Sequence, residues 1–183
     1  MAQRQRDITV NLAVLKRSRK PPQAGDVFVM QPPDGLFLYG RVIATDAKIG
    51  PMKDCILIYV YRPRSERKET VPALLRGQLL APPMMTNKRP WTMGYFETLV
   101  HRELGPMDRL PQHCFYSSPI VPGGFGRYFD EYDNRLPGPV EPVGSRGLDS
   151  FRTIDDKISA ALGIPLAPED EPVSDALAQG MLP

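Results

Sequence analysis

Apolar runs alternate with turn signals along the first third of the chain. Residues 27–30 and 36–43 are rich in β-branched and aromatic side chains, and Asp34-Gly35 between them supplies the positive φ that a tight turn needs. Residues 54–62 (DCILIYVYR) form an almost continuous apolar run, which is typical of a central strand buried on both faces. Three such runs separated by Gly and Pro predict an antiparallel meander.

A glycine and an arginine interrupt the second of these runs. A glycine inside a strand marks a bulge or a sharp bend, so Gly40 predicts a corner where the sheet curls. We expect Arg41, the next residue, to emerge on the outer or rim side of that corner.

Further strands are predicted nearer the C-terminus. Residues 91–100 (WTMGYFETLV) read as a strand, with Trp91 and Tyr95 on one face and Phe96 on the other. At least one of these faces should belong to the core, because aromatic side chains in small sheets usually fill interiors. Residues 127–132 predict one more strand, followed by a turn at Asp133-Asn134.

The clearest helix lies at residues 151–162, where apolar residues recur at helical spacing, Asp149 or Ser150 can cap the start, and Gly163 stops it. A short helix is also expected after Thr70, with leucines on one side. The segment 1–22 fits either a strand or a helix, with the helix slightly preferred.

Composition adds an uneven distribution of charge. The chain has 183 residues, a net charge of +2 and 21 prolines, which favours short elements over long helices. The first twenty residues are basic, whereas the last twenty contain acids and no base, and the composition of residues 164–183 predicts disorder. No segment reads as a signal peptide or a membrane span, and two cysteines make no disulfide framework, so a cytoplasmic setting is expected.

Few residues offer catalytic chemistry. His101 and His113 are the two histidines, and neither lies at a metal-ligand spacing from another ligand type. Cys114 with His101 as its base is conceivable, but a buried, inert thiol is far commoner. The glycines of residues 122–126 lead into a strand and not a helix, which favours a turn over a phosphate loop. We therefore expect no catalytic residues, no cofactor and no metal.

One segment could recognise a protein partner. Tyrosines beside carboxylates combine rigid contact area with charge, which suits the binding of a basic protein surface. The alternative is an edge strand whose charged outer face blunts edge pairing. The candidate partner-binding residues are Tyr128, Asp130, Glu131, Tyr132 and Asp133.

The order of these motifs resembles the immunity protein 26 family of bacterial polymorphic-toxin systems. The similarity is carried by residues 25–44 (GDVFVMQPPDGLFLYGRVIA), then by PWTMGYF, YFDEYDNRL and a terminal amphipathic helix, and it covers about residues 22–163. By position, the residues that match the family motifs are Gly25, Asp26, Gly35, Gly40, Arg41 and Trp91. Physical chemistry makes most of these structural, with Asp26 expected to accept a local backbone hydrogen bond.

The resemblance implies an α+β fold with a curled, mainly antiparallel, barrel-like sheet, a short helix and a C-terminal helix. It predicts an immunity-type domain at residues 23–163. The basic extension at residues 1–22 and the acidic tail at 164–183 follow from composition and lie outside the similarity. The resemblance also implies a non-catalytic protein that binds a cognate secreted toxin, for example a nuclease, and so protects its producer in competition between bacteria. The alternatives are a small nucleic-acid-binding barrel that uses the basic arm, an undetected enzyme, or a structural protein. The sequence leaves the oligomeric state open.

Overall fold

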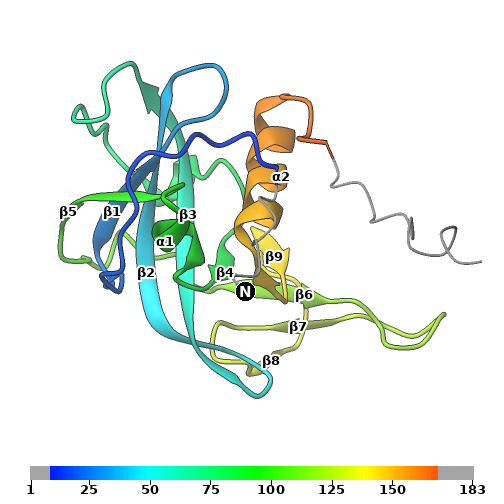
Figure 1. Cartoon of the computed structure of the whole chain (residues 1–183). Helices are drawn as coiled ribbons and strands as arrows, with labels where there is room; N and C mark the ends of the chain where they lie inside the picture. Colours follow the sequence, from blue (N-terminus) through cyan, green and yellow to red (C-terminus); the bar gives the residue numbers. More distant parts are fainter. Residues whose placement is uncertain (1–8, 169–183) are drawn as a thin grey trace, which may run out of the picture.

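The computed structural model describes residues 9–168, and within them the strands form two sheets (Figure 1). The larger sheet has the strand order β10-β4-β3-β2-β1-β5, and the smaller one has the order β8-β7-β6-β9. Neighbouring strands are antiparallel except for the parallel pairs β4–β10 and β6–β9. The prediction of a mainly antiparallel α+β fold is therefore confirmed, although neither sheet closes into a barrel. The elements are β1 (Asp26–Met30), β2 (Phe37–Ile49), β3 (Met52–Ser65), a 3₁₀ turn η1 (Arg76–Gln78), β4 (Met84–Thr86), α1 (Arg89–Met93), β5 (Glu97–His101), β6 (Cys114–Ser117), β7 (Arg127–Phe129), β8 (Arg135–Leu136), β9 (Val143–Ser145), β10 (Leu148–Asp149) and α2 (Phe151–Leu162).

The predicted meander is formed by β1, β2 and β3, which pair in chain order. The turn before β2 has the expected positive φ at Gly35. Every residue from 55 to 61 is buried, as a central strand requires. Because side chains alternate along a strand, Ile58 of β3 joins the core on one face of the large sheet, whereas Tyr59 joins the core on the other.

The helix α2 covers the first of these faces. Its stripe of Phe151, Ile154 and Ile158 is buried in the same cluster as the β1 and β3 side chains. The Ser150 hydroxyl accepts a hydrogen bond from the Thr153 N–H, and Gly163 ends the helix in the left-handed conformation. The position, start and end of this helix are as predicted.

The prediction of a strand at residues 91–96 is wrong. Residues 89–93 form the short helix α1, with Pro90 in its first turn and Gly94 at φ +90° after its end, and only residues 97–101 form a strand. Because the helix turns the chain inward, Trp91, Tyr95 and Phe96 do not lie on opposite faces. All three are buried in the core on the face of the large sheet that α2 covers, which we call the helix-side core. There the Phe28 ring stacks on Phe96, with 4.5 Å between the ring centroids.

The N-terminal segment is not a helix either. Residues 9–22 run as an extended arm along the domain (Figure 1). Leu12 is buried in the helix-side core, and the Asp155 carboxylate of α2 accepts the backbone N–H groups of Asn11 and Leu12. Further along, the Ser18 N–H donates to the Trp91 carbonyl. The arm's backbone donors are thus satisfied by the domain instead of by a helical turn of its own. The first eight residues lie outside the described part of the chain.

The short helix predicted directly after Thr70 is not formed as an α-helix in residues 70–83. Only the 3₁₀ turn at Arg76–Gln78 is formed there, and Leu75 is exposed. The reason is that the following residues pair with the edge of β3, through a bridge of Leu79 to Tyr61 and a hydrogen bond from Leu80 N–H to the Val60 carbonyl. Backbone paired in this way is extended and cannot continue a helix.

The other face of the large sheet is covered by the small sheet and its loops. Phe115 of β6 is fully buried there with Tyr59, Tyr61 and Met85 of the large sheet. A seven-residue ribbon, 143–149, joins the two sheets, because β9 pairs with β6 and β10 pairs with β4. The small sheet is therefore packed on the large one and also connected to it through main-chain hydrogen bonds.

Residues 164–168, after α2, turn back along the helix. The Arg152 guanidinium donates to the carbonyls of Ala167 and Pro168, and Ala167 is buried. Disorder is predicted for residues 164–183, and residues 169–183 of this tail lie outside the described residues.

Candidate partner-binding surface

The first family motif lies on β1 and β2, next to the edge strand β5 of the large sheet. The Asp26 carboxylate accepts the Gln23 N–H, as expected, and its other oxygen lies 2.9 Å from His101 Nδ1 on β5. A methyl group on Gly40 would overlap the ring of Phe28, and the β2–β3 register shifts between Leu38 and Gly40. The predicted bulge at Gly40 is therefore present, and the absent side chain also makes room for Phe28.

The prediction that Arg41 emerges on the outer or rim side is wrong. Its side chain is buried, with about 5% exposure. Its guanidinium lies 2.8 Å from an Asp108 carboxylate oxygen and donates to the carbonyls of Arg102 and Glu103. A charged side chain can be buried here because three acceptors compensate its lost hydration. Arg41 therefore fixes the loop after β5 to the sheet, which is a structural role.

The predicted recognition segment lies on the small sheet. Tyr128 of β7 faces Tyr116 of β6 across the antiparallel pair, with ring centroids 5.4 Å apart, and Tyr132 is 38% exposed in the turn toward β8. Asp130 accepts the backbone N–H groups of Tyr132 and Asn134. The five predicted residues are thus brought together, but the Asp130 carboxylate also closes the turn.

The other two carboxylates of the segment have partners as well. Asp133 lies 2.7 Å from the Arg146 guanidinium and accepts the Gly50 N–H at the tip of the β2–β3 hairpin. Glu131 Oε1 lies 2.9 Å from His113 Nδ1. Both acids therefore bind the small sheet to neighbouring elements, and the negative charge that they present to a partner is partly compensated.

Glu131 begins a buried chain of hydrogen bonds that ends in the large sheet. His113 Nε2 lies 2.5 Å from the Tyr59 hydroxyl, which accepts the Leu110 N–H. Burial alone would raise the pKa of Glu131, but the hydrogen bond and the charge of His113 bring that pKa below its usual value. Burial raises the pKa of Tyr59 to about 12, so this hydroxyl stays protonated at neutral pH. We call these three side chains the Tyr59–His113–Glu131 chain.

The two residues considered for catalysis, His101 and Cys114, have separate partners. His101 is engaged with Asp26 on β1, whereas Cys114 accepts the Val140 N–H in the small sheet, and no hydrogen bond of the described residues joins the two. Within residues 9–168, no group of three or more His, Cys, Asp or Glu could hold a metal ion. No helix in that part of the chain is long and apolar enough to cross a membrane.

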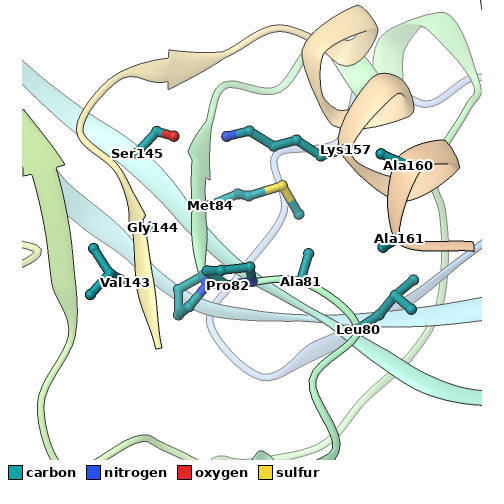
Figure 2. A pocket seen from close by; sticks show the side chains of 11 residues that line it. Leu80, Ala81, Pro82, Met84, Val143, Gly144, Ser145, Lys157, Ala160 and Ala161 are labelled. Carbon is teal, nitrogen blue, oxygen red and sulfur yellow. The ribbon is translucent and has the colours of Figure 1, made fainter. Parts of the chain in front are cut away.

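A mostly apolar pocket lies between α2, β9 and residues 80–84, with a volume of about 290 Å³ (Figure 2). Figure 2 shows the Lys157 side chain and Ser145 at one side of it, with Leu80, Ala81 and Ala161 on the other. The Lys157 ammonium lies 2.7 Å from the Asp149 carboxylate. The lining therefore offers apolar contact area and little free charge.

Comparison with known protein families decides the classification. The family model described as Immunity protein 26 matches residues 23–125, which is more than half of the chain. The chain belongs to the immunity protein 26 family. No curated protein and no solved structure matches it. In this member of the family, the matched region contains the elements from β1 to β6 and part of the hairpin that leads to β7, whereas the arm, β7–β10 and α2 lie outside it.

Sequence reasoning missed a group of exposed apolar side chains in this member of the family. Ile120, Val121 and Phe125 lie in the β6–β7 connection and are 101%, 63% and 94% exposed. The available signal was a run of apolar residues between prolines and glycines, in a stretch that was read only as a turn.

Proposed function

We propose that this protein is a non-catalytic immunity protein, which binds a secreted bacterial toxin in the cytoplasm and blocks its activity. The observation that carries the proposal is membership of the immunity protein 26 family over residues 23–125. A protector needs a stable surface that is complementary to its partner, and it does not need assembled reactive groups. Main-chain pairing and the Tyr59–His113–Glu131 chain support the stability of such a surface, because they hold the small sheet on the larger one.

The recognition segment at residues 128–133 supports a toxin with a basic face, such as a nuclease. Its two tyrosines are partly exposed, and its three carboxylates lie within one short turn. Opposite charges across an interface raise the association rate more than they slow dissociation. We therefore assign this segment to steering of the encounter.

The test of the function is co-expression with the toxin domain encoded by the adjacent gene. The toxin domain alone should arrest growth, and the immunity protein should restore colony formation and copurify with it. Continued arrest with both proteins present and folded would contradict the proposal.

The steering role is tested by removing two charges without adding bulk. The double variant Asp130→Asn with Asp133→Asn should associate more slowly with the purified toxin domain, and the difference should shrink as salt is added. The control is Glu66→Gln with Glu69→Gln, which changes the net charge equally at exposed positions on the β3–η1 connection. Equal association rates for both double variants would exclude steering by the segment while leaving the immunity function intact.

A further inference from the structure

The connection between β6 and β7 projects away from the body of the protein (Figure 1). The two strands pair over only three positions, from Phe115–Phe129 to Ser117–Arg127. Beyond them, residues 118–126 form a projecting loop, and its three apolar side chains Ile120, Val121 and Phe125 are all exposed. We call these three side chains the hairpin knob.

The exposure of the hairpin knob is unusual because the three side chains share one projecting loop. Single exposed apolar residues are ordinary on protein surfaces, but a group of them marks an interaction site. Other large exposed apolar residues, such as Leu75 and Met107, lie in other loops of the molecule. The knob also has the chemistry of an interface anchor, because an aromatic ring and two β-branched side chains bury much area with few rotatable bonds.

The loop that carries the knob is shaped before any partner arrives. Pro119 and Pro122 restrict its backbone, Gly123 adopts φ +77°, and the Gly124 N–H closes a turn on the Val121 carbonyl. At its base, Gly126 lies directly against the ring of Tyr116, where a side chain would not fit. A preorganised loop loses little conformational entropy on binding, so more of the contact energy appears as affinity.

A hollow of about 360 Å³ is lined by the three side chains of the hairpin knob and other loop residues, together with Arg127, Phe129 and Arg146. The Arg146 guanidinium lies over the Phe129 ring at 4.4 Å and is also paired with Asp133. Arg127 is exposed and belongs to no ion pair of residues 9–168. The base of the hairpin therefore presents one uncompensated positive charge.

We propose that the hairpin knob is the anchor for the toxin, entering an apolar cleft whose acidic rim meets Arg127. This inference rests on the proposed immunity function and names the part of the surface that supplies the affinity. A projecting loop needs a receptor with a cleft, and the carboxylate at the rim of that cleft follows from Arg127, which belongs to no ion pair of residues 9–168.

A second copy of this chain is the alternative occupant that the test has to exclude. The apolar pocket in Figure 2 is the concave candidate on the same molecule, but it lies between α2, β9 and residues 80–84, away from the knob's own residues. Insertion of the knob into that pocket of another copy would be a head-to-tail contact. Such contacts propagate into rings or filaments, which would compete with toxin binding.

The experiment measures binding of the purified toxin domain to the full-length protein by calorimetry or surface plasmon resonance. The variant Ile120→Ser with Phe125→Ser should bind at least ~100-fold more weakly, mainly through faster dissociation, as expected for interface anchors. The matched control is Leu75→Ser with Met107→Ser, which should bind like the wild type. Both pairs are exposed, so unfolding temperatures should remain close to that of the wild type.

Each alternative gives a different result. If the wild type binds and the knob variant binds equally well, the anchor inference is wrong and the immunity function stands. If the wild type does not bind the toxin domain, both proposals fail. If sedimentation shows wild-type self-association that the knob variant loses while toxin binding persists, the occupant is a second copy and our assignment is overturned. Arg127→Gln should weaken toxin binding in a salt-dependent manner, and an unchanged affinity would remove the acidic rim from the proposal.

Discussion

At Gly40, the space next to the backbone is filled by a neighbouring ring. Phe28 lies opposite Gly40 in the β1–β2 pair and is fully buried against Trp91 and Phe96. The ring cannot move aside for a new side chain without displacing both aromatic neighbours. A glycine at this position is therefore required by packing as well as by the bulge in β2.

We predict that Gly40→Ala destabilises the protein by about 1–3 kcal/mol, because overpacking in a filled core costs that much. Urea unfolding followed by fluorescence measures the effect. Gly77→Ala is the control, since a methyl group there would meet no atom within 4 Å. A similar loss in both variants would mean that the contact with Phe28 is not the cause.

The residue that sequence reasoning placed wrongly is Arg41. Its position next to Gly40 was clear, but its burial depends on Asp108, which lies in a loop far along the chain. A single sequence does not show which distant acid will compensate a buried cation. The same limit applied to His113, whose two partners come from β3 and from the turn after β7.

At the scale of elements, local signals were sufficient where they agreed with one another. For α2, the apolar stripe, the Ser150 cap and Gly163 all indicated the same boundaries, and the structure confirms them. For residues 89–96, the apolar pattern resembled a strand, but Pro90 at the start and Gly94 at the end are the signals of a short helix. The meaning of the knob loop was missed for another reason, because exposure of an apolar run cannot be read from its composition.

The arm is the element with the clearest consequence for stability. Leu12 is about 5% exposed in the core, and the Asp155 carboxylate receives two of the arm's N–H groups. Burial raises the pKa of Asp155, although those two hydrogen bonds oppose the shift. Without the arm, this buried carboxylate would lose both of its main-chain donors.

We predict that deletion of residues 1–22 lowers the free energy of unfolding by at least about 2–5 kcal/mol, the usual cost of removing one large core side chain. Deletion of residues 1–8, which leaves the described arm in place, is the control and should change it little. Denaturant unfolding of both proteins gives the comparison. Equal stability of the two truncated proteins would show that the arm contributes nothing to the core.

At the scale of the whole molecule, β3 of the large sheet also packs against the small sheet. Tyr59 of β3 lies between the large sheet and the small one, and its hydroxyl connects to His113 and then to Glu131. The folded-state pKa of Glu131 is below its ordinary value, so ionised Glu131 stabilises the folded state. This contribution is present above the unfolded pKa and is lost as the pH falls through the folded pKa.

We therefore predict that Glu131→Gln destabilises the protein by about 1–3 kcal/mol at pH 7, as expected for a buried hydrogen bond that loses its charge. The difference from the wild type should decrease as the pH is lowered below about 4. Thermal unfolding at a series of pH values measures this difference. The control is Glu141→Gln, because Glu141 is more exposed and does not belong to the Tyr59–His113–Glu131 chain. A difference that is independent of pH would indicate a purely steric effect.

The ribbon at residues 143–149 has a mechanical consequence for the proposed binding of a toxin. It adds a strand to each sheet, with only Arg146 and Gly147 between the two strands. A pull on the hairpin would therefore pass through β6 and β9 into β10 and β4 and spread over the whole fold. The base of the β6–β7 hairpin is therefore rigid, so a toxin bound to the hairpin knob would dissociate at the interface before the small sheet bends away from the large one.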